Sequence, residues 1–239
     1  MEEPLILHIE TATDICSVAI SKGDQQLSLV ESGPERSHAT LLNQFIRKAL
    51  AQSGKELQQL DAIAVSKGPG SYTGLRIGVS TAKGLAYGLG KPLLACGTIE
   101  NMAYASMEHP EVRKLAQHFK KSLLLCPMLD ARRMEVYAAF YTTTISSVKE
   151  VSADIIDENS YSDMLAENQV CFFGNGAVKC KEVLTSQNAH FVDGLNPSAG
   201  SMVIPVLRHF RQEQFEDVAY FEPFYLKDFV ATKPRKKVL

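Results

Sequence analysis

A glycine-rich stretch over residues 66–78, SKGPGSYTGLRIG, has residue types that could hold a phosphate group. It follows a short apolar run and leads into a helical pattern, and the N–H groups that open a helix bind anions. The stretch lacks the lysine of a P-loop, and Gly74 comes one residue too late for a dinucleotide-binding loop. It therefore predicts either a general anion loop or a tight turn that needs glycine, and the residues concerned are Gly68, Gly70 and Ser71.

Two carboxylates near the start of the chain could bind magnesium or a water molecule. Glu10 and Asp14 lie at and just after the end of the first predicted strand, and the turn between them contains Thr11 and Thr13. Acidic residues are also common in ordinary turns, because their side chains accept hydrogen bonds from nearby backbone N–H groups. The sequence leaves both interpretations open.

A charged turn from Asp130 to Glu135 separates two apolar, strand-like runs. Its adjacent arginines, Arg132 and Arg133, suit the recognition of phosphate or carboxylate groups. The alternatives are a polar contact surface and a solvated hairpin tip.

Other catalytic patterns are missing from the sequence. The six histidines show no His-x-x-x-His or His-Glu-x-x-His spacing, and there is no Gly-x-Ser-x-Gly motif. The five cysteines are scattered and odd in number, which suits free thiols in a reducing cytoplasm. We therefore expect neither a metal site nor a serine hydrolase.

The overall charge excludes a general attraction to nucleic acid or membranes. The 239 residues carry a net charge of −2, and no apolar run reaches the roughly 20 residues that span a membrane. The N-terminus lacks the features of a signal peptide, so a cytoplasmic location is expected. A basic tail is either a solvated end or a contact for RNA or an acidic partner, and it contains Lys233, Arg235, Lys236 and Lys237.

Alternating strands and helices must position these groups. Strands are predicted over residues 5–10, 15–21, 26–31, 61–66 and 93–96, and helices over 38–50, 73–89 and 99–107. The order along the chain is therefore three strands, then helix, strand, helix, strand and helix. Ser37 is the expected N-cap of the first helix, and Gly54 its stop. Hairpins followed by crossovers predict a mixed sheet with helices packed on it.

A similar order of strands and helices is predicted again from about Lys121. Strands are predicted over 122–129, 135–141, 145–151, 170–173 and 190–192, and helices over 161–167, 177–185 and 198–210. The recurrence suggests two related lobes. A polar stretch at 106–121 is the expected linker, which gives domains 1–106 and 107–239, with a C-terminal segment able to pack back on the first.

Small residues form one stripe on the helix predicted over 73–89, because they recur at intervals of four. A bare stripe allows close approach, either to the protein's own sheet or to a partner. The helix before it also has a broad apolar face, so the two could form half of a four-helix bundle across an interface. The predicted interface residues are Leu41, Leu42, Phe45, Ile46, Gly74, Gly78, Ala82 and Ala86.

Three blocks of the sequence resemble the TsaB (YeaZ) family: ILHIETATDICSVAI, KGPGSYTGLRIGVSTAKGLAYGLGKPLLACGTIENMA and LDARRMEVYAAFY. The stretch FEPFYLKDF is similar to the family's C-terminal signature. The resemblance implies an α/β, actin-like ASKHA (ribonuclease H-like) fold of two related lobes with mixed sheets and packed helices. In that superfamily an aspartate opens a phosphate-binding turn, and Glu10 takes its place here.

The family's catalytic paralogue, TsaD, is similar to this chain through the glycine-rich loop, and then carries a His-x-x-x-His metal motif. Thr98 and Met102 stand at those two positions here. Without imidazole ligands, metal-assisted transfer cannot run in this chain. The resemblance thus implies an inactive paralogue with no cofactor of its own, and places ATP and metal on the partner subunits.

The implied role is a non-catalytic scaffold that pairs with TsaD through its first two long helices. The ATPase TsaE joins the pair. The assembly threonylcarbamoylates N6 of the adenosine beside the anticodon in tRNA, and this chain would meet the tRNA only indirectly, through the complex. In isolation the same helices could form a homodimer. The alternatives are an actin-like ATP-binding protein, an M22-type metallopeptidase-like (glycoprotease-like) enzyme, or an RNA-binding module that uses Arg132, Arg133 and the basic tail.

Overall fold

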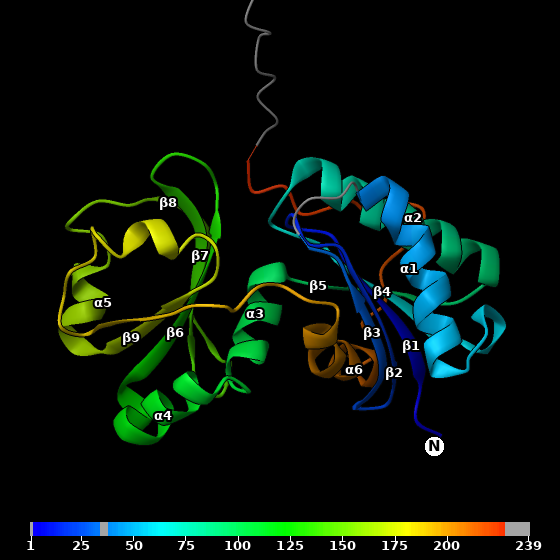
Figure 1. Ribbon diagram of the computed structural model, residues 1–239, viewed down its shortest axis with the longest axis horizontal. Coiled ribbons are helices and arrows are strands. Elements are labelled where there is room, and N and C mark those ends of the chain that lie inside the picture. Colours follow the sequence, from blue (N-terminus) through cyan, green and yellow to red (C-terminus); the bar gives the residue numbers. More distant parts are fainter. Residues whose placement is uncertain (1, 34–37, 228–239) are drawn as a thin grey trace, which may run out of the picture.

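Two five-stranded sheets form the centres of two lobes in the computed structural model, which describes residues 2–33 and 38–227 (Figure 1). The first sheet has the order β3-β2-β1-β4-β5, and its strands are β1 (Leu5–Glu10), β2 (Ser17–Lys22), β3 (Gln25–Glu31), β4 (Ala62–Ser66) and β5 (Leu93–Cys96). The second has the order β10-β9-β6-β7-β8, and its strands are β6 (Leu123–Asp130), β7 (Glu135–Thr142), β8 (Ser147–Ile155), β9 (Gln169–Phe173) and β10 (Ala189–Val192).

The two sheets share one topology. In the first, β1, β2 and β3 form an antiparallel meander, and β4 and β5 add in parallel on the other side of β1. In the second, β6, β7 and β8 form the meander, and β9 and β10 add in parallel beside β6. This repeated mixed sheet confirms the predicted α/β fold of two related lobes.

Helices cover both faces of the first sheet. On one face, α1 (His38–Ser53) and α2 (Tyr72–Leu89) bury their apolar sides against β1, β2 and β4. On the other, α6 (Val203–Arg211) packs against β5. Gly54 and Gly90 follow α1 and α2 with φ of +64° and +62°, the left-handed conformation in which helices commonly end. Ser37, the expected N-cap of α1, lies outside the described residues.

The second sheet is covered by α3 (Thr98–Ser106) and α4 (Pro110–Phe119) on one face and by α5 (Ser162–Glu167) on the other. Helix α4 occupies most of the polar stretch 106–121, around which the domain boundary was predicted, and it buries Val112 in the core of the second lobe. Pro110 opens this helix, a position where its missing N–H costs no hydrogen bond.

The helix predicted over 177–185 is wrong. Only a single 3₁₀ turn, Val178–Cys180, forms there. The backbone bonds mostly span three residues, from the Cys180 amide to the Ala177 carbonyl and from the Val183 amide to the Cys180 carbonyl. Such geometry does not extend into long helices.

After α6 the chain returns along the first lobe. The Glu216 amide donates to the Leu93 carbonyl, Lys83 of α2 donates to the carbonyls of Ala219 and Phe221, and the Phe224 amide donates to the Lys67 carbonyl. We call residues 216–227 the C-terminal strap. The division at residues 106 and 107 stays a prediction. No helix among the described residues is long and apolar enough to cross a membrane.

Candidate functional site

The lobes face each other across a cavity of about 500 Å³. Loops from both lobes line it, including the glycine-rich loop, the turn after β1, the turn after β6 and the end of the C-terminal strap. Of the predicted site residues, the cavity brings together Thr13, Gly70, Ser71 and Arg132, with Asp14 beside them. Glu10 and Gly68 do not line it.

The two predicted anion loops are pressed against each other. The Ser71 amide donates to the Ala12 carbonyl at 2.6 Å, and a Cβ on Gly70 would lie 2.3 Å from the same oxygen. Gly68 has a φ of +107°, and a Cβ there would lie 2.8 Å from the Phe224 carbonyl oxygen. These glycines meet the steric needs of a tight turn, and the two loops touch at Ala12 and Ser71.

Glu10 is fully buried and turned inward, which favours the interpretation as a turn residue over that as a ligand for magnesium or water. Its Oε1 accepts a hydrogen bond from the Ala12 amide at 2.7 Å. Burial raises the pKa of the Glu10 carboxyl to about 7, although this hydrogen bond and the nearby side chains of Ser66 and Asn101 oppose the shift. The carboxyl group therefore stabilises the turn from inside and is not accessible to a cation in the cavity.

Thr11 points to the opposite face of the sheet, into the contact with α2. A Cβ on Gly74 would lie 2.1 Å from the Thr11 carbonyl oxygen, and one on Gly78 would lie 2.2 Å from Thr11 Oγ1. The small-residue stripe thus lets α2 pack closely on its own lobe.

This packing corrects the predicted interface. The predicted residues on α1 and α2 face the first lobe's core, and all are buried except Phe45, which is half-buried: Leu41, Leu42, Ile46, Gly74, Gly78, Ala82 and Ala86. An apolar stripe on a helix packs on the nearest apolar surface, and here that surface is the protein's own sheet. A partner that meets these helices would contact their other sides.

The outward side of α2 carries a second small-residue stripe that sequence reasoning missed. Ser80, Gly84 and Gly88 also recur at intervals of four, and a Cβ on Gly84 or Gly88 would meet nothing within 4 Å. Tyr87 stands beside them with 84% of its surface exposed. Tyr220 of the C-terminal strap is equally exposed and lies between the two carbonyls that Lys83 holds. We call Ser80, Gly84, Tyr87, Gly88 and Tyr220 the outward face.

The arginine turn joins β6 to β7 and is held by several side-chain contacts. Arg132 and Arg133 are both exposed and have φ of 70° and 50°, a conformation that residues other than glycine rarely adopt. Lys179 holds the turn from below, because its Nζ donates to the carbonyls of Arg133 and Glu135 at 2.6 and 2.7 Å and pairs with Asp130. Glu135 in turn pairs with Lys227 of the C-terminal strap.

The positions aligned with the metal-binding histidines hold no imidazole. Thr98 and Met102 are buried on α3, and Thr98 Oγ1 shares a 2.7 Å hydrogen bond with Ser66 Oγ. Within residues 2–33 and 38–227, no group of three or more His, Cys, Asp or Glu side chains is placed to hold a metal ion.

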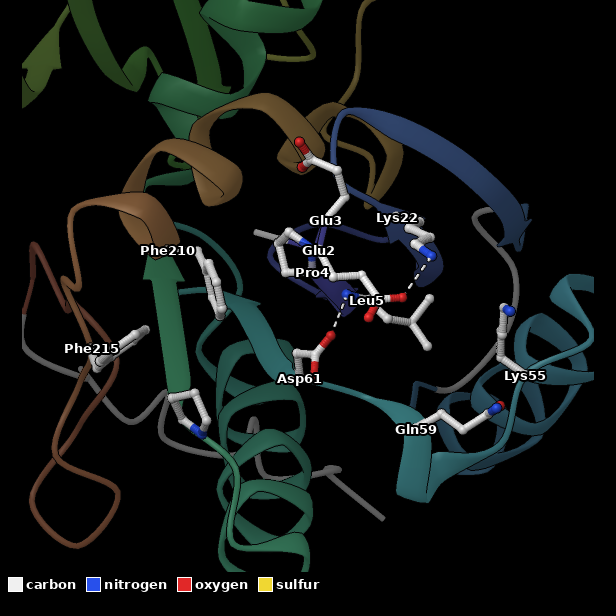
Figure 2. Close-up of a pocket in the computed structure, with 11 residues that line it drawn as sticks. Glu2, Glu3, Pro4, Leu5, Lys22, Lys55, Gln59, Asp61, Phe210 and Phe215 are labelled. Carbon is white, nitrogen blue, oxygen red and sulfur yellow. Dashed lines mark hydrogen bonds and ion pairs between the residues drawn. The ribbon is translucent and has the colours of Figure 1, made fainter.

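A second cavity, of about 480 Å³, lies at the other end of the first sheet (Figure 2). Lys22 pairs with Glu2 across it, and the Leu5 amide donates to Asp61 at 2.8 Å. Glu3, also in its wall, pairs with Arg211. Its acidic groups are thus held mostly by neighbours of the same chain, and this cavity offers no convergent set of ligands.

Comparison with known proteins identifies relatives over most of the chain. Residues 32–234 match the model of the family described as TsaD, tRNA N6-adenosine threonylcarbamoyltransferase. The tRNA threonylcarbamoyladenosine biosynthesis protein TsaB of Escherichia coli is 30% identical, over 95% of this chain and 96% of its own length. The Haemophilus influenzae protein of the same name is 33% identical, but that match spans only 57% of this chain and 53% of that protein.

A solved structure agrees on the fold. YeaZ from Pseudomonas aeruginosa superimposes with a TM-score of 0.74 at 24% identity, over 93% of this chain and all of that chain. The basic tail and its predicted RNA contact lie outside the described residues.

Proposed function

The chain belongs to the TsaB family, and from that premise we propose that it is a non-catalytic subunit of the machinery that makes threonylcarbamoyladenosine in tRNA. It pairs with a catalytic TsaD-family protein and favours the partner's active conformation. A subunit that binds only the competent state of its partner raises the population of that state. The near full-length match to a TsaB protein is the observation that carries the proposal.

The non-catalytic role is supported by the site itself. The carboxylate that could have served a nucleotide is buried, the two candidate phosphate loops touch, and the buried Thr98 and Met102 supply no imidazole for a metal. The partner therefore carries out the transfer reaction, with its own ATP and metal. TsaE is proposed as a further member of the assembly, and the isolated chain is proposed to form a homodimer through the surface that would otherwise meet TsaD.

We place the partner contact on the outward face, instead of the buried stripe. Gly84 and Gly88 leave room for a helix to approach the backbone of α2 closely, the exposed Tyr87 lies beside them, and the exposed Tyr220 is held near α2 through Lys83. Tyrosine is enriched at interface hot spots because it buries a large apolar area and keeps a polar end. The arginine turn, Arg132 and Arg133, is a second proposed contact, suited to carboxylates of the partner.

Reconstitution tests the proposal. Purified TsaD-family partner, TsaE, ATP and unmodified tRNA should yield threonylcarbamoyladenosine only when this chain is added. Formation of the product at full rate without the chain would refute the scaffold role. Tight ATP binding and turnover by this chain alone would instead favour the actin-like ATPase, and a stoichiometric metal with peptidase activity would favour the M22-type enzyme.

Two single substitutions test the surface. Tyr87→Glu places a charge at the centre of the outward face, and we expect it to weaken co-elution with the partner at least tenfold. Val178→Glu is the control, because Val178 is also well exposed (60%) but lies in the second lobe. Equal losses in both variants, or none in Tyr87→Glu, would count against this interface.

A further inference from the structure

A row of basic side chains follows α4 and the 3₁₀ turn after it, Lys120–Ser122. Lys114 and His118 lie four residues apart on one side of α4, and Lys120 and Lys121 follow directly where the helix ends. All four are exposed. We call these four residues the α4 ridge.

The cations of the ridge have no acidic partners within the described residues. None of its three lysines forms an ion pair there, whereas the neighbouring Arg113 and Glu108 pair with each other. The chain as a whole is slightly acidic, with a net charge of −2. Clustered, unpaired lysines on such a chain form a local electropositive surface.

Lys120 has a backbone conformation that favours glycine. Its φ and ψ are 52° and −122°, and its amide donates to the Ala116 carbonyl to end the helix. Helices α1 and α2 use Gly54 and Gly90 for the same task. A lysine in this position is strained, and such strain is retained mostly where a side chain has a use.

Aromatic rings lie beside the lysines. Phe119 contacts the His118 ring at 4.5 Å and the His190 ring at 5.0 Å between centroids. Phe119 is half-buried against the core of the second lobe, and it holds the exposed His118 ring at the edge of the ridge. An aromatic ring next to cations is a combination with which proteins bind RNA, by stacking on bases and pairing with phosphates. Figure 1 places α4 on the second lobe, away from α1 and α2, so a partner on the outward face would leave the ridge free.

From these observations we propose that the α4 ridge contacts the phosphate backbone of RNA. The choice of tRNA as that RNA rests on the proposed function. An anionic membrane would also attract lysines, but membrane-surface helices insert an apolar face. The apolar side of α4 is already used, because Val112 is buried and Leu115 packs in the core of the second lobe.

The test is tRNA binding by the full chain, alone and paired with its catalytic partner. A fluorescent, unmodified tRNA transcript is titrated with the wild type and with Lys120→Gln/Lys121→Gln at several salt concentrations. We expect the double variant to bind about tenfold more weakly at low salt, with a salt slope smaller by about 1.5, since each lost phosphate contact removes about 0.7–0.9. The control is Lys55→Gln/Lys91→Gln, which removes the same charge from the first lobe.

The outcomes are distinct. A loss confined to the ridge variant supports the proposal, and equal behaviour of wild type and ridge variant overturns it. Ridge-dependent binding to phosphatidylserine vesicles with no binding to tRNA overturns it in favour of a membrane. Co-elution with the partner is measured in parallel, so that intact pairing without a ridge effect refutes this inference alone, whereas absent pairing refutes the proposed function.

Discussion

Gly78 of α2 and Thr11 of the first turn are in direct contact, with no room for a side chain between them. A Cβ on Gly78 would lie 2.2 Å from Thr11 Oγ1, well inside any normal contact. Thr11 is fully buried and belongs to the strand–turn unit that begins the first lobe. The two residues thus fix how closely α2 approaches β1.

Alanine at two glycines of the same helix should have opposite effects. We expect Gly78→Ala to lower the free energy of unfolding by about 1–3 kcal/mol, because the methyl group overpacks the contact with Thr11. We expect Gly84→Ala to raise it by up to about 1 kcal/mol, because alanine favours the helix and its Cβ meets open space. Urea unfolding measures both. Stabilisation by Gly78→Ala would contradict the packing described for α2.

The contrast between these glycines indicates what the sequence could predict. The spacing of four between Gly74, Gly78, Ala82 and Ala86 correctly predicted a helix face with small side chains. The order of apolar runs correctly predicted a mixed sheet with helices packed on it. The same interval occurs at Ser80, Gly84 and Gly88, and only the position of the sheet decides which stripe is buried. Local spacing does not contain that information, because it depends on tertiary packing.

Glu10 illustrates a second limit of sequence reasoning. Its position at the end of β1 was predicted correctly, but the sequence did not indicate where its side chain points. Alternation along a strand puts Glu10 on the face of Ile6 and His8, and its carboxyl is buried there beside Ser66 and Asn101. Helix α4 was missed for a related reason, since its polar, proline-containing sequence is typical of a linker and only Val112 among its residues is fully buried.

Glu10 should make the stability of the protein depend on pH. Its folded pKa of about 7 lies above the ordinary 4.5, so the folded state binds the proton more tightly. The stability from this group is therefore fully present below pH 4.5, and is lost as the pH rises through 7. The loss is about 3 kcal/mol at most, from 1.36 kcal/mol per pKa unit. We expect Glu10→Gln, which stays neutral, to lack this decline when urea unfolding is measured from pH 5 to 8.

His8 makes the stability of the protein depend on pH in the opposite direction from Glu10. The effect of Glu10 must therefore be taken as the difference in stability between the Glu10→Gln variant and the wild type. Burial lowers the pKa of His8 to about 3, and its contribution is present above pH 6.5 and lost as the pH falls. The difference between Glu10→Gln and wild type cancels this term, because both retain His8. A difference that stays constant from pH 5 to 8 would show that the Glu10 carboxyl is not perturbed.

Lys83 should hold the C-terminal strap on the first lobe. Its ammonium donates to the carbonyls of Ala219 and Phe221 at 3.2 and 2.7 Å. We expect Lys83→Met to cost about 1 kcal/mol of stability and to speed chymotrypsin cleavage after Tyr220 or Phe221, because the strap opens locally more often. Lys91→Met is the control, since Lys91 has no hydrogen bond to the strap. Equal cleavage rates in both variants would mean that the strap is held by its other contacts.

Lys120 offers a test of backbone strain that is independent of RNA. Its positive φ favours glycine, so Lys120→Gly should raise the free energy of unfolding by about 1 kcal/mol, even though glycine gains entropy in the unfolded chain. The same substitution at Lys121, which lacks a positive φ, should lower it by up to about 1 kcal/mol. Thermal unfolding of the pair reads out the difference. If Lys120→Gly destabilises the chain as much as Lys121→Gly does, Lys120 is not strained, and the argument that its side chain is retained for binding loses its basis.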